Sequence, residues 1–405
     1  MVTILRRPLL LGLRVGVALS LLAGCGKDEK GEVKLRRTRD QAAVVIVDGK
    51  QEANAAVEIE PNNQPSEMQV LSSGTTLSGT LEGSKDLDRY GFTPEQEGML
   101  FVELGGAPDA DLKLELFDGE GGSLASSDRG PAGTVEGVAG IWVIPKTSYQ
   151  IVVSEFTKKK HRKTGGRQGT SAPYRLSLRL QSSAEASFEL EPNEDIDGAS
   201  EIIAGEERFG YLGWKGDRDL WRMPVSGFAD VSVVTVGEGA PRPALNIVLS
   251  GVAKLATKLR LLDAEGNAIA ERVATRGQEV AIRSFIPEVA AEFYVIEVSE
   301  KRSNPEESYM LRVEKTLIAA GGEEEPNDEL ESATPLPGDD SVMIEAHGEL
   351  CQGDVDMFSI SPASENRVLE LRVQGPKDAD LDVSLLAESG AVLASHAEEV
   401  LGAAV

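Results

Sequence analysis

Two short acidic motifs occur three times in this 405-residue chain, and both consist of residues that can bind a metal ion. The first motif is Glu-x-Glu-Pro-Asn. The second motif, Asp-x-Asp, begins 26, 26 and 29 residues after the glutamate that precedes the proline. Carboxylate and amide oxygens are hard ligands, which Ca²⁺ takes six to eight at a time. The residues with such oxygens in the two motifs are Glu58, Glu60, Asn62, Asp86 and Asp88 in the first copy, Glu189, Glu191, Asn193, Asp217 and Asp219 in the second, and Glu323, Glu325, Asn327, Asp354 and Asp356 in the third.

The residue after each asparagine also carries a side-chain oxygen, as Asn63, Glu194 or Asp328. A second interpretation of the motifs stays open here, because Pro-Asn can simply turn the chain into a strand while the aspartates cap strand ends. A short motif is informative only in its structural context. The sequence therefore makes Ca²⁺ a candidate cofactor without requiring it.

The motifs mark an internal repeat, because successive copies of the glutamate before the proline lie 131 and 134 residues apart. A repeat of this length predicts a domain that has been copied along the chain. We assign residues 58–181, 189–315 and 323–405 to three modules. The third copy lacks a counterpart of the last strands of the first, so we expect it to have an unpaired sheet edge or an incomplete core. An aromatic residue follows each Asp-x-Asp, as Tyr90, Trp221 and Phe358.

Apolar residues alternate with polar ones along many short segments, which is the pattern of strands with one buried face. Asp- and Gly-rich segments of the kind that form tight hairpins separate them. The sequence thus predicts an all-β protein of tandem antiparallel, jelly-roll-like β-sandwiches, with the third copy incomplete. The clearest strands span residues 99–104, 112–117, 149–153 and 174–180, and the clearest turns span residues 118–122 and 263–267.

The order of these elements resembles the bacterial pre-peptidase C-terminal domain. The resemblance rests on Glu-Pro-Asn, Asp-x-Asp-x-aromatic, a leucine-alternating strand with an Asp-x-x-Gly turn, and a closing Tyr-x-Leu-x-Leu/Val strand, and it covers about residues 58–405. The second copy departs from the pattern at residues 245–262. The family implies a jelly-roll-like sandwich, often appended to secreted proteases and related to the collagen-binding modules of clostridial collagenases. Those modules place calcium between the two motifs, which implies the same ligands here.

Residues 1–24 have the pattern of a bacterial lipoprotein signal peptide. Arg6 and Arg7 form its positive region, residues 9–22 are mostly apolar, and the Leu-Ala-Gly before Cys25 resembles the box at which that cysteine is lipidated. An ordinary signal peptide or a short membrane helix is the alternative, although the apolar stretch is short for a span. We predict a lipid anchor in the cell envelope, on the outer membrane of a Gram-negative bacterium, with residues 25–57 as a tether.

The net charge argues against nucleic acid as a partner, because 67 Asp and Glu outnumber 41 Lys and Arg and leave the chain at −26. One basic run lies on the loop between the strands predicted at residues 149–153 and 174–180. Such a run can contact sulfated or phosphorylated glycans or anionic lipids, but more often it is simply solvated. Its residues are Lys158, Lys159, Lys160, Arg162 and Lys163.

The sequence contains no motif that would assemble a catalytic group, and we predict that the protein is not an enzyme. The Gly-Thr-Ser-Ala-Pro segment at residues 169–173 lacks the partner segments of a serine protease, and Cys351 has no histidine in a motif context. We predict a surface-anchored binding or adhesion protein whose ligand is a polysaccharide, a matrix protein or an envelope protein, since repeated weak sites gain avidity. The alternative is a substrate-binding or targeting region of a longer secreted protease or other hydrolase.

Overall fold

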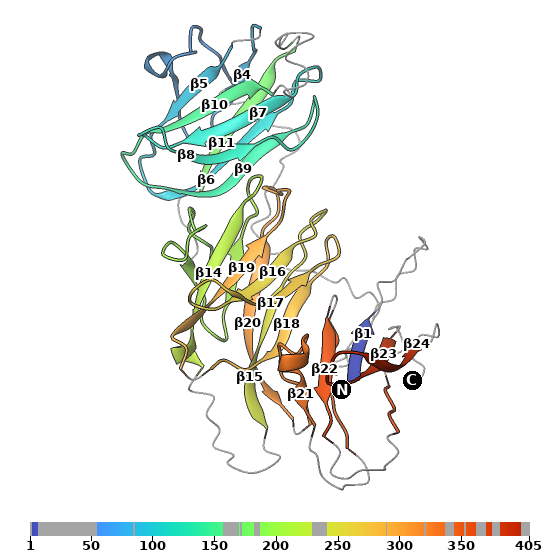
Figure 1. Cartoon of the computed structure of the whole chain (residues 1–405). Coiled ribbons are helices and arrows are strands. Elements are labelled where there is room, and N and C mark those ends of the chain that lie inside the picture. Colours follow the sequence, from blue (N-terminus) through green and yellow to red (C-terminus); the bar gives the residue numbers. More distant parts are fainter. Residues whose placement is uncertain are drawn as a thin grey trace, which may run out of the picture.

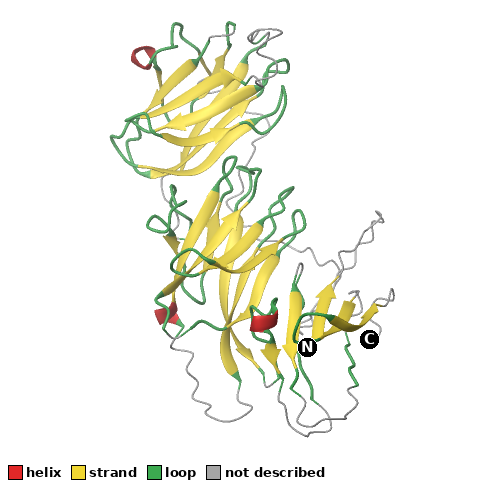
Figure 2. Cartoon of the chain, in the orientation of Figure 1, coloured by secondary structure: helices red, strands yellow, loops and turns green. Residues whose placement is uncertain are grey.

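The structure is a computed structural model in which β-strands form almost all of the regular secondary structure (Figure 2). It describes residues 2–6, 55–83, 86–156, 170, 172–181, 187–228, 241–288, 290–319, 321–336, 344–351, 354–361, 370–374 and 381–397. Within these ranges the only helices are three single 3-10 turns, η1 (Pro65–Glu67), η3 (Val225–Gly227) and η5 (Leu330–Ser332). The predicted all-β fold class is confirmed.

The first module is a sandwich of two five-stranded sheets (Figure 1). Neighbouring strands are antiparallel except for two short parallel pairs, β2–β4 and β3–β5. One sheet has the order β3 (Gln69–Leu71), β5 (Asp88–Phe92), β10 (Tyr149–Glu155), β7 (Leu112–Phe117), β8 (Ser123–Ser127). The other has the order β2 (Ala55–Val57), β4 (Thr76–Gly79), β11 (Tyr174–Gln181), β6 (Gly98–Gly105), β9 (Glu136–Val143).

The second module repeats this arrangement with one strand fewer. Its five-stranded sheet has the order β12 (Ser200–Glu201), β14 (Arg218–Pro224), β19 (Phe293–Ser299), β16 (Lys258–Leu262), β17 (Ala268–Val273). Its four-stranded sheet has the order β13 (Glu207–Gly210), β20 (Tyr309–Ile318), β15 (Arg242–Leu249), β18 (Val280–Phe285).

The described strands of the third module form one sheet, with β1 (Val2–Arg6) at its centre. β1 lies antiparallel between β22 (Val355–Ser359) and β23 (Leu381–Leu386), where β10 lies in the first module and β19 in the second. We expected an unpaired edge or an incomplete core in this module, and its described residues form a single sheet without a second sheet facing it. We expected residues 1–24 to lie outside the fold, whereas Val2–Arg6 form a strand of this sheet. The sheet is completed by β21 (Thr334–Pro335) and β24 (Val392–Ala397).

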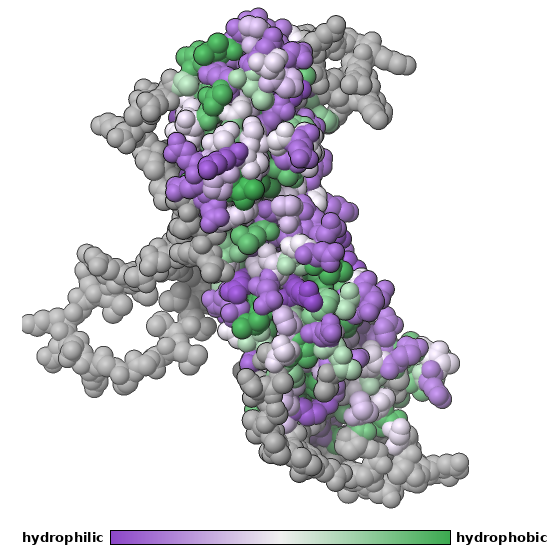
Figure 3. All heavy atoms as spheres, turned by 90° about the vertical axis from the view of Figure 1, so that its left-hand side faces the viewer, coloured by the Kyte–Doolittle hydropathy of each residue, from purple (hydrophilic) through white to green (hydrophobic). Residues whose placement is uncertain are grey.

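The cores follow directly from the alternating pattern. Along β7 every second residue is buried, and its Leu114 packs in one cluster with Leu104 of the opposite sheet. The second module has a core of the same kind, centred on residues such as Leu259 and Ile296. On the face shown in Figure 3, the remaining hydrophobic side chains lie in small groups among hydrophilic ones.

The predicted hairpin turns are present, and an aspartate stabilises each of them. Asp118 Oδ1 accepts hydrogen bonds from the backbone N–H groups of Glu120 and Gly122, at 2.9 and 2.7 Å. Asp263 Oδ1 does the same in the second module. These side chains supply acceptors for backbone donors that the two-strand ladder leaves free.

Several predictions fall outside the described residues. They include the lipidation site Cys25, almost all of the tether, and the basic run at residues 158–163. The last tether residues, Ala55–Val57, form strand β2 of the first module. Among the described residues, no helix has the length and hydropathy needed to cross a membrane.

Candidate metal centres

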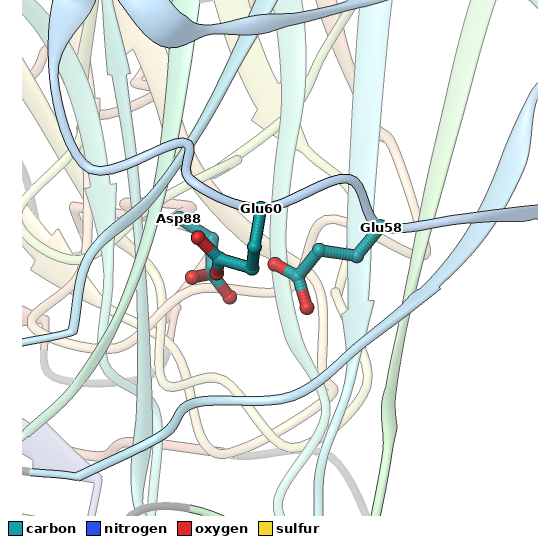
Figure 4. Close-up of side chains that lie close together, drawn as sticks. All are labelled: Glu58, Glu60 and Asp88. Atoms are coloured by element: carbon teal, nitrogen blue, oxygen red, sulfur yellow. The ribbon is translucent and has the colours of Figure 1, made fainter.

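The carboxylates of the two acidic motifs converge in all three modules. In the first module, Glu58, Glu60 and Asp88 each offer one oxygen, and these oxygens lie within 4.8 Å of one another (Figure 4). Two ligands of one Ca²⁺ are at most about 5 Å apart, because each Ca–O bond is about 2.3–2.6 Å. The corresponding groups are Glu189, Glu191 and Asp219 in the second module and Glu323, Glu325 and Asp356 in the third. We call these three groups the inner clusters.

The local backbone aims the two glutamates of each motif at the same point. The Glu–Pro peptide bond is cis in all three copies, at Glu60–Pro61, Glu191–Pro192 and Glu325–Pro326. The backbone N–H of the following asparagine then donates to the carboxylate of the second glutamate, as from Asn62 to Glu60 Oε2 at 3.0 Å. The equivalent bonds in the second and third modules are 2.8 and 3.2 Å long.

The asparagine of the motif is completely buried in every module, yet its carbonyl oxygen has no hydrogen-bond partner. Asn62, Asn193 and Asn327 are each 0% exposed, and Oδ1 of each lacks a donor. In the first module Asn62 Nδ2 donates to Glu58 Oε1 at 3.0 Å, and in the second Asn193 Nδ2 donates to Glu189 Oε2 at 3.3 Å. Because an unsatisfied buried acceptor is costly, it needs an explanation such as an ion.

Several carboxylate oxygens in the inner clusters are orphaned in the same way. Both oxygens of Asp219 are buried without a partner, as are Oδ1 of Asp88 and Oδ1 of Asp356. A buried carboxylate is normally hydrogen-bonded, paired or bound to a metal. The three carboxylates of each inner cluster therefore fit Ca²⁺ chemically, and the unpartnered oxygen of the neighbouring asparagine is a ligand of the same hard type.

A second group of carboxylates lies beside the inner cluster in two of the modules. These outer clusters consist of Glu191, Glu194 and Asp217 in the second module and of Glu325, Asp328 and Asp354 in the third. Each outer cluster shares its central glutamate with the inner one. In the first module the residue after the asparagine is Asn63, whose Oδ1 accepts from the N–H of Leu87 at 2.8 Å, and Asp86 joins no group of three acids among the described residues.

The inner clusters are also bound by a tyrosine that the sequence indicated only as the start of the closing strand. Tyr174 donates to Asp88 Oδ2 in the first module, and Tyr309 donates to Glu189 Oε2 at 3.1 Å in the second. Trp221, the aromatic residue after Asp-x-Asp, donates through Nε1 to the Tyr309 hydroxyl at 2.9 Å. In the second module, the aromatic residue of the Asp-x-Asp-x-aromatic pattern thus donates a hydrogen bond to the tyrosine that binds the cluster.

Burial raises the pKa of most of these acids, and neighbouring carboxylates raise it further. For Glu191, burial and then the charges of Glu189 and Asp217 raise the pKa to about 11. Burial is also the main cause that raises the pKa of Asp88 and of Asp356 to about 9. Without a cation, these groups therefore retain protons at neutral pH, and a divalent cation that binds them must displace those protons.

The second and third sites lie at junctions between modules. Glu191 forms a parallel bridge with Ile141 of β9, and Glu325 forms one with Phe285 of β18. The preceding module covers both glutamates, so that Glu191 is 2% exposed and Glu325 is 4% exposed. The equivalent Glu60 of the first module is exposed. Each later site is thus closed by the module before it.

The half-buried Cys351 lies close to the third site without the features of a nucleophile. Its backbone N–H donates to Asp354 Oδ2 at 2.9 Å. Burial, followed by the charge of Asp354, raises the pKa of its thiol to about 11. Because the thiolate is the reactive form, this environment disfavours nucleophilic chemistry.

Comparisons with known proteins give structural neighbours only. No protein-family model matches the chain, and no curated protein matches it. The pre-peptidase C-terminal domain of a collagenase from Bacillus anthracis is matched over its whole length by 29% of this chain, with 18% identity and a TM-score of 0.23. At this identity and score the similarity concerns the fold, and no functional argument rests on it.

Two larger enzymes are matched by more of the chain. A GH2 β-galacturonidase from Eisenbergiella tayi is matched by 64% of it, with 10% identity and a TM-score of 0.17, and tripeptidyl peptidase 2 is matched by 60%, with 11% identity and a TM-score of 0.22. The matched regions cover 37% and 24% of those two proteins. These scores likewise carry no functional argument.

Proposed function

We propose that this protein is a non-catalytic binding protein, built from cation-stabilised β-sandwich modules and attached to the cell envelope through a lipid on Cys25. One observation supports a bound cation above all others. The side-chain carbonyl oxygens of Asn62, Asn193 and Asn327 are buried, and none of them has a hydrogen-bond partner. A turn or a strand cap would satisfy such an oxygen with a backbone donor, whereas a Ca²⁺ site uses it as a ligand.

The cation we propose is Ca²⁺, held by the inner clusters together with the asparagine oxygen. When bound, it would supply electrostatic cross-linking rather than catalysis. The residues themselves join distant parts of each module, because the two glutamates precede β3, β12 or β21, whereas the aspartate lies within the first two residues of β5, β14 or β22. Neutralising buried like charges would stabilise the folded state alone.

Thermal melting tests the cation. A ligand at 100 times its Kd stabilises the folded state by about 2.7 kcal/mol, which corresponds to roughly 10–15 °C for domains of this size. We expect millimolar Ca²⁺ to raise the Tm over that in chelator by this order. Asp219→Asn is expected to abolish most of the shift in the second module, while Glu201→Gln, at an exposed site in the same module, leaves it intact. Equal melting with and without Ca²⁺ in the unaltered protein contradicts the cation.

We propose that the ligand binds in a groove of about 560 Å³ between the first two modules. Its lining is basic although the chain is acidic, and it includes a buried Ser303 hydroxyl without a hydrogen-bond partner. Among the described residues, four of its five cations make no ion pair, whereas Arg129 pairs with Glu306 at 3.1 Å. Unpaired cations spread along a groove favour an acidic polysaccharide. These four are Lys215, Lys254, Lys301 and Arg302.

A charge-matched pair of variants tests the groove. Heparin serves as the acidic polysaccharide and neutral dextran as the control. Lys215→Gln combined with Lys301→Gln is expected to weaken heparin binding about tenfold, because two charge-assisted contacts are lost. Lys146→Gln combined with Lys315→Gln changes the net charge equally at exposed positions elsewhere and is expected to bind as the unaltered protein does. Equal weakening by both pairs contradicts a specific groove.

Lipidation at Cys25 would follow removal of residues 1–24, so the mature protein would lack β1 and its third sheet would lose the central strand. The anchor is tested separately in the bacterium. Incorporation of labelled palmitate into the protein, and its loss on Cys25→Ala, is the expected outcome. Incorporation that survives this substitution contradicts lipidation at Cys25.

A further inference from the structure

Arg272 of the second module and Ser127 of the first occupy the same position in their modules. The comparison starts at the second aspartate of the Asp-x-Asp motif. Asp88 pairs with Val153 of β10, and Asp219 pairs with Val298 of β19. The two valines are therefore equivalent.

From these valines the register continues to the edge of the sheet. Val153 pairs with Leu114 of β7, and Val298 pairs with Leu259 of β16. On their other side, Leu114 pairs with Ser127 of β8 and Leu259 pairs with Arg272 of β17. The same position thus carries a hydroxyl in the first module and a guanidinium in the second.

The guanidinium of Arg272 reaches out of its own module into the outer cluster of the third. Its Nη1 donates to Asp328 Oδ2 at 2.9 Å, and its Nη2 donates to Glu325 Oε2 at 3.1 Å and to Asp354 Oδ1. Arg272 is 3% exposed, as buried as Glu325 and Asp354, whereas Asp328 is half-buried. Its planar fork serves all three carboxylates at once.

The outer cluster of the second module has no such partner. Ser127, at the position equivalent to Arg272, donates instead to Glu136 within the first module, at 2.7 Å. Among the described residues no Lys or Arg side chain pairs with Glu191, Glu194 or Asp217. Oε1 of Glu191 is buried without any hydrogen-bond partner. The two outer clusters have the same arrangement of acids, but only one is neutralised by the protein.

We propose that Arg272 is a built-in substitute for a divalent cation. In the third module it occupies the outer cluster and locks the junction of the second and third modules without a metal. In the second module the outer cluster takes a divalent cation instead, so the junction of the first and second modules is sensitive to chelation. This inference rests on the proposed cation-binding function and extends it by assigning which junction depends on the ion.

Equivalent aspartates in the two outer clusters provide a matched test. Ca²⁺ bound per full-length chain is measured by equilibrium dialysis. Asp217→Asn is expected to lower the number of bound ions by one, whereas Asp354→Asn is expected to leave it unchanged, because Arg272 occupies that cluster. A loss of one ion in both variants, or in neither, overturns the inference. If the inner clusters still bind Ca²⁺ in that case, the proposed function stands. Absence of any bound Ca²⁺ in the unaltered protein overturns both.

The arginine itself provides the converse test. Arg272→Ser recreates the residue of the first module and is expected to add one bound Ca²⁺ per chain. Arg272→Lys retains the positive charge and is expected to add none. An unchanged number in Arg272→Ser overturns the inference. If Arg272→Ser does not fold, the Asp217 and Asp354 pair decides the question alone.

Discussion

Glu191 of the second module forms a parallel β-bridge with Ile141 of the first, and its carbonyl oxygen accepts a hydrogen bond from the N–H of Trp142 at 3.3 Å. The next junction repeats the contact, because Glu325 lies beside Phe285 and donates its N–H to the carbonyl of Ser284 at 3.2 Å. Each Glu-x-Glu-Pro-Asn segment thus continues the edge of the preceding sheet. Assembly of the acidic cluster and stacking of the modules are therefore coupled through the same backbone.

Substitution of Gly213 tests this coupling. A Cβ atom at Gly213 would lie 2.2 Å from the backbone carbonyl oxygen of Ala139 in the first module. We expect Gly213→Ala to separate the two modules at a cost of about 1–3 kcal/mol, since backbone atoms on both sides must move. Limited proteolysis at the junction and a lower Tm are the expected results.

Gly91→Ala is the control for that substitution. A Cβ atom at Gly91 would meet only the Met68 side chain, at 3.9 Å, which is ordinary contact. It is expected to change the Tm by little. Equal resistance to protease in Gly213→Ala and the unaltered protein would show that the junction does not depend on this close approach.

The hydroxyl of Tyr309 is predicted to stabilise the second module. It donates to Glu189 Oε2 and accepts from Trp221 Nε1, and the residue is completely buried. Tyr309→Phe leaves Trp221 Nε1 without its acceptor and removes one of the two hydrogen bonds to Glu189 Oε2, at a cost of about 1–3 kcal/mol. Urea denaturation measures the loss. Tyr149→Phe, which removes a hydroxyl that accepts only from the N–H of Ile144, is expected to cost less.

The pH dependence of stability should differ between the metal-free and the Ca²⁺-loaded protein. Burial raises the pKa of Asp88 to about 9 and that of Glu191 to about 11, so the folded metal-free protein holds more protons than the unfolded chain above about pH 4. Its stability therefore falls as pH rises towards 9, by up to about 1.4 kcal/mol per pH unit for each such carboxyl.

Bound Ca²⁺ removes this dependence, because it requires the same carboxylates to be deprotonated in the folded state, as they already are in the unfolded chain above about pH 5. We expect the Tm of the protein saturated with Ca²⁺ to change little between pH 5.5 and pH 8, while that of protein freed of metal by gel filtration falls over the same interval, so that the stabilisation by Ca²⁺ grows with pH. Parallel pH profiles in the two preparations contradict the assignment of these acids as ligands.

The sequence by itself determined the strands, the turns and the identity of most candidate ligands. Alternation along residues 112–117 leaves only one face of that strand apolar. Asp118 belongs to the few residue types whose side chain can accept the free backbone N–H groups of a tight turn. The spacing of Glu60 and Asp88 recurs in the later copies, so that, together with the family resemblance, the sequence pointed to the acids that the structure brings together in the inner clusters. These are local properties of the chain.

Only the tertiary structure decided what surrounds the acids. No pattern in the sequence indicated that Glu191 would be covered by Ile141 or that Arg272 would enter the cluster of Glu325 and Asp354, because these residues meet through packing of separately folded modules. The place of β1 in the third sheet is likewise a contact between distant segments. The burial of a carboxylate, and hence its need for a cation, depends on neighbours that local periodicity does not encode.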